Sequence, residues 1–305
     1  MQSCPLCQSK SCRTINSVMG NDSVKHSILL CNNCGHFFTG ISKMGDPNLL
    51  YDEGDYEIRH TQKSIFFKIQ YWEYRKVLNG LLGAGYKSAS KFLDFGCGKG
   101  VFLHIAQKQG FNNLHGVETS APRANYAIKN YGVDVSKEFY SNGILMYGEF
   151  DVITLFHVLE HLPQPISLLK ELFLMNLKKN GMVVIEVPNY SSFQSKLSGN
   201  KWLHLDVPRH ISHFTKEKLE TCIEELDLII VKKQTFSLHL GIIGMAQAIL
   251  NLFGYKGFLI RDLKEGKRFI KLIILVLLPI ALILEGISSI FNRGGIIRVY
   301  AKPKR

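Results

Sequence analysis

Asp94-Phe95-Gly96-Cys97-Gly98-Lys99-Gly100 is the stretch of this 305-residue sequence that decides the fold. It ends a short apolar run that begins at Lys91, and it precedes a segment, 101–109, with the apolar periodicity of a helix. Its three glycines let the backbone turn sharply and approach a ligand closely at the N-terminus of that helix. A dinucleotide-binding loop has the spacing G-x-G-x-x-G, whereas here the third glycine comes one residue earlier.

Strand and helix patterns alternate on both sides of this stretch. Short apolar runs separated by amphipathic segments are typical of a parallel sheet covered by helices. The sequence therefore predicts an α/β fold with a doubly wound, Rossmann-like sheet. Strands are predicted at 91–95, 114–118, 151–156 and 182–187, and helices at 61–83, 101–109 and 166–178.

Two acidic residues give the glycine stretch a chemical character. Glu118 ends the second predicted strand, 22 residues after Gly96, where an acid can accept hydrogen bonds from both hydroxyls of a ribose. Asp94 can face an ammonium group, which a dinucleotide lacks. The pair indicates a ligand that carries both an adenosine-like sugar and an amino acid.

These residues resemble the first two motifs of class I S-adenosylmethionine (SAM)-dependent methyltransferases. The stretch 151–156 and the following His157-Val158-Leu159-Glu160-His161-Leu162-Pro163 look like the fourth strand and loop of the small-molecule branch of that superfamily. A Rossmann-like protein with other chemistry remains the alternative. No clear acid follows the third strand near 133–135, so the residue that contacts the adenine amino group is unassigned. The resemblance implies that SAM is bound by Asp94, Gly96, Cys97, Gly98, Gly100 and Glu118, with Phe156 and His157 at the sulfonium end.

Two C-x-x-C pairs open the chain. Cys4 and Cys7 form the first pair, and Cys31 and Cys34 form the second, 23 residues further on. Each pair can direct two thiolates to one tetrahedral ion, so residues 1–40 are predicted to form a zinc ribbon that depends on Zn²⁺ for stability. A redox-active pair is the alternative. Cys12 falls outside the pattern.

The segment 202–215, after the fifth predicted strand, is rich in aromatic and titratable residues and is the expected acceptor wall. His210 is the candidate general base, because imidazole titrates near neutral pH, and His213 is the second candidate. The stretch resembles sugar C-methyltransferases that carry an N-terminal zinc module. Arg209 is a candidate for gripping a phosphate or carboxylate of the acceptor. The alternative is that both histidines only hydrogen bond the loop.

The sequence does not decide the roles of two further pairs of residues. Glu160 and His161 could bind a divalent ion, as similar loops do in some ubiquinone-type O-methyltransferases, or they could cap the next helix. Tyr51 and Tyr56 could fold over the cofactor or lie on the surface of a linker.

Residues 236–294 are mostly apolar and interrupt the alternating pattern. If 228–235 and 296–301 pair as an edge hairpin, the apolar segment is a helical hairpin inserted before the last strand. The run 272–284 has no charge but is shorter than the ~20 residues needed to cross a bilayer, and Pro279 interrupts it. We expect a re-entrant or interfacial helix pair on a membrane; a buried hairpin that serves as a lid or a dimer interface is the alternative.

Charge and cysteine content are consistent with a membrane surface facing the cytosol. The formal net charge is +12, and residues 256–305 hold eleven lysines and arginines against three acids. Basic residues beside an apolar stretch favour anionic lipid headgroups over a nucleic acid groove. The N-terminus shows no signal peptide pattern, and seven cysteines indicate reduced thiols in a cytosolic body.

The predicted organisation is a zinc module at 1–40, a methyltransferase domain at 41–235 plus 295–305, and an apolar hairpin at 236–294. The leading functional hypothesis is methylation of a small-molecule acceptor, either a saccharide or a lipid-linked glycan precursor, at the cytosolic face of a membrane. The alternatives are O-methylation of a quinone or another lipid, and a non-catalytic or nucleic-acid-binding protein. Nucleic acid is not expected as a partner, because Lys10, Arg13 and Lys25 are the only basic residues of the zinc module.

Overall fold

The computed structural model describes residues 3–40, 65–137, 148–265 and 267–304. Tyr51 and Tyr56 lie outside the described residues, as do the first residues of the helix predicted at 61–83.

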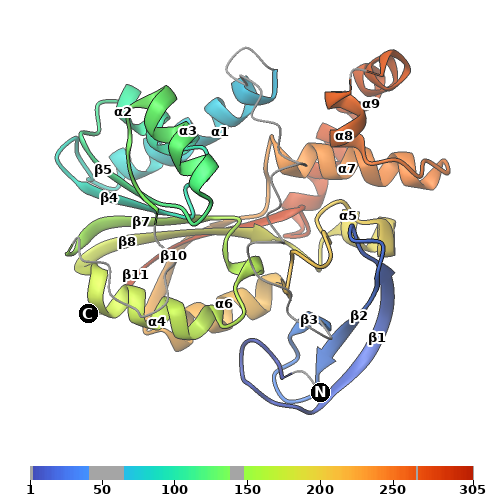
Figure 1. Ribbon diagram of the computed structural model, residues 1–305, viewed down its shortest axis with the longest axis horizontal. Helices are drawn as coiled ribbons and strands as arrows, with labels where there is room; N and C mark the ends of the chain where they lie inside the picture. The colour runs from blue at the N-terminus through green and yellow to red at the C-terminus, as the bar shows by residue number, and fades with distance from the viewer. Residues whose placement is uncertain (1–2, 41–64, 138–147, 266, 305) are drawn as a thin grey trace.

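A seven-stranded sheet forms the centre of the molecule (Figure 1), in the order β10-β11-β8-β7-β4-β5-β6. The strands from β6 to β8 pair in parallel, while β11 runs antiparallel to both of its neighbours. The predicted doubly wound α/β fold is therefore confirmed. The strands are β4 (Lys91–Phe95), β5 (Asn113–Val117), β6 (Asp134–Ser136), β7 (Phe150–Phe156), β8 (Leu177–Pro188), β10 (Leu228–Gln234) and β11 (Ile296–Pro303).

Helices cover both faces of this sheet, so that the central strands are buried on both sides (Figure 1). Apolar residues of β4 alternate between the two cores: Phe92 packs with the core of α1 and α2, and Leu93 packs with the core of α4 and α6. Each such side chain contributes roughly 1.5–3 kcal/mol when fully buried. One face carries α1 (Ile65–Gly83), α2 (Val101–Lys108) and α3 (Ala121–Tyr131), and the other carries α4 (Pro165–Asn176) and α6 (Lys216–Glu225).

The N-terminal segment forms a second, smaller sheet that includes a strand from the main domain. Its order is β1-β2-β3-β9, where β9 comes from the loop after β8. Phe37 pairs with His213, and the Thr39 amide donates to the carbonyl of Ile211 at 2.8 Å. The segment 202–215, the expected acceptor wall, is thus joined to the cysteine-rich segment by backbone hydrogen bonds. The strands are β1 (Cys12–Met19), β2 (Lys25–Cys31), β3 (Phe37–Gly40) and β9 (Ser212–His213).

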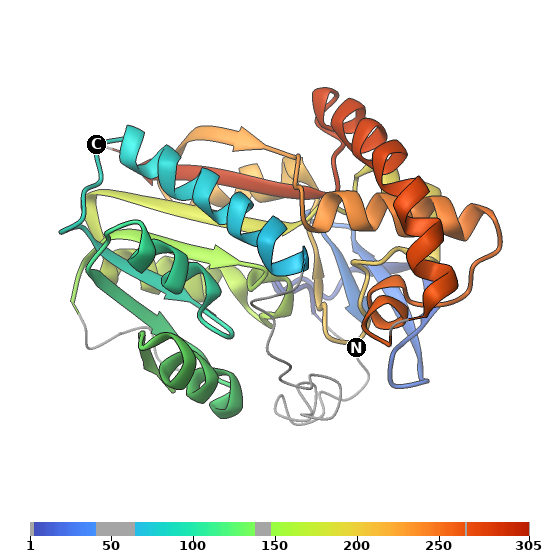
Figure 2. The same cartoon turned by 90° about the horizontal axis from the view of Figure 1, so that it is seen from above.

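The predicted pairing of the last two strands is confirmed, with one difference. β11 lies inside the sheet between β8 and β10, so of these two strands β10 alone is at an edge of the sheet. The apolar segment leaves the sheet after β10 and returns at β11, at the end where the parallel strands have their carboxyl termini (Figure 2). It contains α7 (Leu240–Leu252), α8 (Leu259–Lys264) and α9 (Arg268–Ile290), and it packs on α5 (Phe193–Ser198).

Candidate functional site

The glycine loop joins β4 to α2 with three residues in the left-handed region. The φ angles of Gly96, Gly98 and Gly100 are 75°, 55° and 71°. A Cβ atom at Gly96 would lie 2.6 Å from Val158, and one at Gly100 would lie 2.7 Å from Ala127. Nothing lies within 4 Å of the corresponding position at Gly98. Two glycines are therefore required by packing, and the third presents bare backbone to open space, as a cradle for a ligand does.

Glu118 lies directly after β5 and faces this loop. Its carboxylate accepts hydrogen bonds from the amide of Gly98 and from the amide of Ser120, both at 2.8 Å, and the residue is 6% exposed. A carboxylate offers about four lone-pair sites, so acceptor capacity remains for the hydroxyls of a ribose. The buried acid thus fits the role that the resemblance implied.

Asp94, at the end of β4, is a buried carboxyl beside the glycine loop. The Thr154 hydroxyl donates to it at 2.7 Å. Burial raises the pKa of Asp94 to about 7, and the negative charge of Glu118 contributes to the rise. A cation bound nearby would stabilise the ionised form, so the site fits the ammonium group of SAM.

Cys97 and Phe156, the next two predicted cofactor contacts, differ in which of their atoms could reach a ligand. Cys97 is buried, and a side chain at Gly116 would meet its sulfur at 2.7 Å, so the Cys97 side chain packs inward. Phe156, at the end of β7, packs between Tyr74 and Phe102, with ring centroids 5.0 Å from each. Cys97 could reach a ligand through its backbone, whereas Phe156 forms part of an apolar wall.

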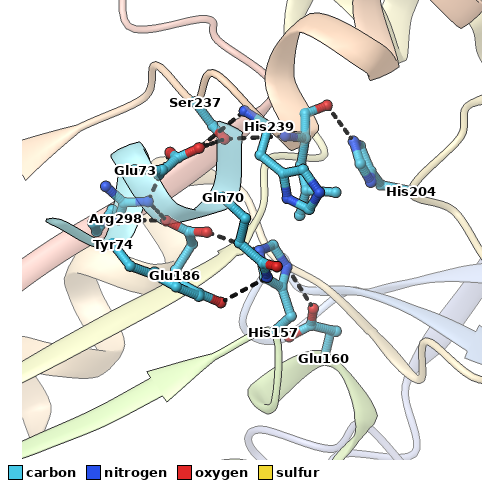
Figure 3. A network of polar contacts seen from close by, with 11 residues as sticks. Gln70, Glu73, Tyr74, His157, Glu160, Glu186, His204, Ser237, His239 and Arg298 are labelled. Atoms are coloured by element: carbon cyan, nitrogen blue, oxygen red, sulfur yellow. Dashed lines mark hydrogen bonds and ion pairs between the residues drawn. The ribbon is translucent and has the colours of Figure 1, made fainter. Parts of the chain in front are cut away.

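His157 follows β7 with a φ of 57°, a conformation that costs energy in a residue with a side chain. Its Nε2 lies 2.8 Å from Glu186, and its Nδ1 lies 3.3 Å from Glu160 (Figure 3). Burial alone would lower the pKa of His157, but the two carboxylates raise it to about 10. The ring is therefore held as a cation beside the glycine loop.

A buried network of charges continues from His157 toward the insertion (Figure 3). Glu186 of β8 also pairs with Arg298 of β11, and Arg298 pairs with Glu73 of α1 at 2.9 Å. Glu73 in turn accepts from the Ser237 hydroxyl and from the amide of His239, both at 2.9 Å. The network joins the sheet, α1 and the start of the insertion.

His239 and His204 complete a group of histidines near His157 (Figure 3). The imidazole of His239, just before α7, points toward His157, and burial together with the charge of His157 lowers the pKa of His239 to about 4. His204 Nε2 donates to the carbonyl of Leu240 at 3.2 Å, and burial lowers the pKa of His204 to about 3. The insertion thus places a neutral histidine at the site.

His210 lies near these residues. Its Nδ1 donates to the carbonyl of His204 at 2.8 Å, which leaves the Nε2 of the neutral ring as the proton acceptor. One ligand atom from each of Glu160, His161 and His210 lies within 4.8 Å of the other two. Glu160 is 1% exposed, and its Oε2 accepts no hydrogen bond from the described residues. The geometry accommodates either a base at His210 or a divalent cation.

His213 and Arg209 have structural partners. His213 Nε2 is hydrogen bonded to the Thr39 hydroxyl at 2.9 Å, and the residue is 3% exposed, where β9 joins β3. Arg209 donates to Asp206 at 2.8 Å, and its carbonyl lies 3.0 Å from His161 Nδ1. Of the two predicted catalytic histidines, His210 has a ring nitrogen within 4.8 Å of a carboxylate oxygen of Glu160, whereas His213 is hydrogen bonded to Thr39.

The four N-terminal cysteines converge as their spacing predicted. Their sulfur atoms all lie within 4.8 Å of one another, with Cys4 to Cys34 and Cys7 to Cys31 at 3.6 Å. Tetrahedral Zn²⁺ with bonds of ~2.3 Å separates thiolates by about 3.8 Å, so the cluster fits this ion. The Cys12 sulfur lies 3.6 Å from the carbonyl of Ser9, outside the cluster.

Sequence reasoning missed Glu73, Glu186, Arg298 and His239. An arginine and a glutamate in two apolar strands were the available signal, because a charge at a buried strand position needs a partner. Glu73 gave no such signal, because polar residues are ordinary in an amphipathic helix, whereas His239 is a polar residue at the start of the apolar segment 236–294.

With this geometry in place, comparison with known proteins defines the class. A family model described as a methyltransferase domain matches residues 68–233, more than half of the chain. The chain belongs to this family, and the predicted resemblance to class I SAM-dependent methyltransferases is confirmed. A solved structure of an S-adenosylmethionine-dependent methyltransferase from Clostridium acetobutylicum ATCC 824 aligns with a TM-score of 0.51 and 12% identity. That alignment covers 80% of this chain and 96% of that one, and it concerns the fold alone.

Two curated relatives are ubiquinone biosynthesis O-methyltransferases. The protein from Actinobacillus pleuropneumoniae serotype 7 (strain AP76) is 27% identical over 150 residues, and that from Histophilus somni (strain 2336) is 31% identical over 154 residues. The matches cover 45% and 47% of this chain and 61% and 58% of those proteins. The chain thus spans about three fifths of the length of these relatives.

Proposed function

We propose that this protein transfers a methyl group from SAM to a small-molecule acceptor. The observation that carries the proposal is the arrangement of Glu118 and Asp94 around the open backbone of Gly98. One acid is positioned for a ribose and the other for an ammonium group, and only a ligand with both groups uses the whole site. SAM supplies an electrophilic methyl group on a sulfonium when it is bound.

The residues of this chain would align the two reactants and manage a proton. Positioning reactants in line is worth several kcal/mol, and a well-placed base adds 10²–10⁴-fold. Phe156 and His157 border the expected sulfonium end, and His210 stays the proposed base through Nε2. His213 stays a weaker proposal, since its ring is engaged by Thr39.

The acceptor is proposed to be a hydroxyl-bearing molecule attached to a lipid. A lipid-linked saccharide and a quinol both have this chemistry. The apolar insertion, which brings His239 to the site, supports a lipid-borne acceptor. The two curated relatives favour the quinol, and the resemblance of the 202–215 segment favours the saccharide.

Zinc and membrane attachment belong to the same proposal. Cys4, Cys7, Cys31 and Cys34 would hold one structural Zn²⁺, a role that their converging sulfur atoms support. Within the described residues, one helix, with the segment Leu272–Ile290, is long and apolar enough to cross a membrane. This feature, together with the basic charge of the C-terminal region, supports association with the cytosolic face of a membrane.

Calorimetric titration tests the cofactor assignment. Wild-type protein should bind SAM and S-adenosylhomocysteine with saturation and should not bind NAD. Gly98→Ala should weaken SAM binding about tenfold or more, because its methyl group would occupy the open side of the loop. Gly110→Ala is the matched control, since Gly110 also has a positive φ, of 91°, and no neighbour within 4 Å, but follows the C-terminal end of α2, opposite the end that carries the loop. Folded wild-type protein that binds neither ligand would favour a non-catalytic scaffold.

A further inference from the structure

One face of α9 is apolar and exposed along its whole length. Seven of the exposed positions recur every three or four residues and form a stripe on the helix, and the exposed Leu275 and Leu282 lie next to stripe residues in the sequence. A helix of 23 residues is about 35 Å long, so the apolar surface extends over the full length of the helix. The stripe consists of Phe269, Leu272, Val276, Ile280, Ile283, Ile287 and Ile290, which are between 46% and 77% exposed.

The opposite face of α9 is fixed to the body of the protein. Ile270, Ile274 and Ala281 are buried with residues of α7 in one apolar core. Glu285 is fully buried and accepts from the amide of Gly295 at 2.6 Å and from Gln194 at 3.1 Å. The helix therefore cannot leave α7 without exposing that core and breaking the bonds of a buried carboxyl.

The two apolar helices of the insertion therefore differ in how much of their surface is buried by protein. Ten consecutive residues of α7, from Gly241 to Leu250, are buried, whereas only 22% of the apolar window of α9 is buried. Figures 1 and 2 show α9 at the outside of the molecule, beyond α7. A pair of helices crossing a bilayer together would need both to face lipid, and α7 faces protein.

Basic residues flank α9 in the sequence. The segment 236–294 contains seven lysines and arginines against three acids, a net charge of +4, and one of the acids is the buried Glu285. Arg293 is exposed shortly after the C-terminal end of α9, where Phe291 is also exposed. Lys256 and Arg261 are exposed in the connection between α7 and α9, which begins with the exposed Phe253. Aromatic and basic side chains flanking an apolar stripe match the interface of a bilayer with anionic headgroups.

We propose that α9 lies in the plane of one membrane leaflet, with its stripe inserted among the acyl chains and the flanking basic residues on anionic lipid headgroups. The proposal specifies how the protein would contact the membrane that the proposed function invokes. It rests on that function only where it implies a lipid-borne acceptor. A second copy of this chain is a poorer occupant, because two surfaces of like charge would repel each other.

Co-flotation with vesicles tests the surface. Full-length protein should bind phosphatidylcholine vesicles that contain about 30 mol% phosphatidylglycerol. It should bind vesicles of pure phosphatidylcholine more weakly, because the basic residues are attracted to the anionic headgroups. Leu272→Gln/Val276→Gln/Ile283→Gln should reduce binding about tenfold or more. The matched control is Leu174→Gln/Ile229→Gln/Val231→Gln, which removes three apolar residues with 51–75% exposure from α4 and β10.

A protease site tests the in-plane orientation. With a cleavage sequence inserted between Gly254 and Gly257, protein bound to the outside of sealed vesicles should be cut completely by added protease. A spanning hairpin would carry this loop into the lumen and protect it, which would overturn the in-plane arrangement.

Two further results would contradict the lipid surface. Equal vesicle binding by the stripe variant and the control would overturn the lipid surface, as would a dimer in solution that only the stripe variant abolishes. SAM titration of the same variants separates this proposal from the function: the stripe variant should keep its SAM affinity. Lipid binding by a protein that binds no SAM would leave the surface supported and the methyltransferase proposal contradicted.

Discussion

At the scale of single residues, the proposed role of Asp94 predicts that binding of SAM depends on pH. Burial raises the pKa of free Asp94 to about 7, and the ammonium of SAM is proposed to bind the ionised carboxylate. Below pH 7 the carboxyl must therefore lose its proton before the ligand binds, and affinity should fall by up to about tenfold per pH unit. Calorimetry between pH 5.5 and 7 measures this fall, and buffers of different ionisation enthalpy count the proton released.

Asp94→Asn provides the control for that titration. The amide cannot ionise, so the variant should bind SAM more weakly and with much less dependence on pH. Wild-type affinity that stays constant across the same range would show that Asp94 is already ionised in the free protein or does not face the ammonium.

The two histidines that face the acceptor region can be separated by kinetics. His210→Asn should lower kcat by about 10²-fold or more and change the affinity for SAM less than twofold, because a base acts on the acceptor proton. His239→Asn should mainly raise the KM for the acceptor, since its ring borders His157 from the insertion. Near-normal turnover of the His210 variant, with a large loss of kcat in the His239 variant, would move the base to the insertion.

The turn of the glycine loop and the position of Glu118 beside it could be predicted from sequence, because both depend on local geometry. A left-handed turn requires glycine, and the acid follows a strand at a fixed distance. The surroundings of His157 could not be predicted, because Glu186 and Arg298 reach it from strands that are far away in the sequence. Buried ion pairs depend on the register of strands, which periodicity does not specify.

At the scale of elements, the ion pairs of Arg298 fasten β11 to β8 and to α1. Arg298→Met should lower the free energy of unfolding by about 3–5 kcal/mol, because it leaves Glu73 as a buried charge without its cation and leaves Glu186 with His157 alone. Urea denaturation followed by circular dichroism measures the change. The double variant Arg298→Met/Glu73→Gln should recover part of the loss, since it removes the unpaired charge. A loss below about 1 kcal/mol in the single variant would show that water reaches the network.

Periodicity predicted the elements of the insertion but not their environments. The sequences of α7 and α9 are both apolar, and they were expected to contact the membrane in the same way. In the structure α7 is buried by α5 and α9, whereas α9 is exposed on one face. An apolar helix is compatible with a protein core and with lipid, and only tertiary packing distinguishes the two.

At the scale of the whole molecule, three parts of the chain meet at one end of the sheet. The N-terminal module contributes β3, the main domain contributes the loop that carries His210 and β9, and the insertion contributes His239. The sequence predicted each part separately. Their contact could not be predicted, because the pairing of β3 with the two-residue strand β9 leaves no pattern in the sequence.

This contact predicts how loss of zinc reaches the acceptor region. Cys4→Ser should remove the metal and lower the melting temperature, whereas Cys12→Ser should keep one zinc per chain, since its sulfur lies outside the cluster. The amide of Ile211, next to β9, donates to the carbonyl of Glu160 at 2.7 Å, so disorder in the module should spread to the loop around His210. We therefore expect Cys4→Ser to lower kcat more strongly than SAM affinity, which depends on the glycine loop. Metal analysis, calorimetry and turnover of both variants measure the effect, and equal loss of SAM affinity and kcat would show that the module supports the whole domain instead.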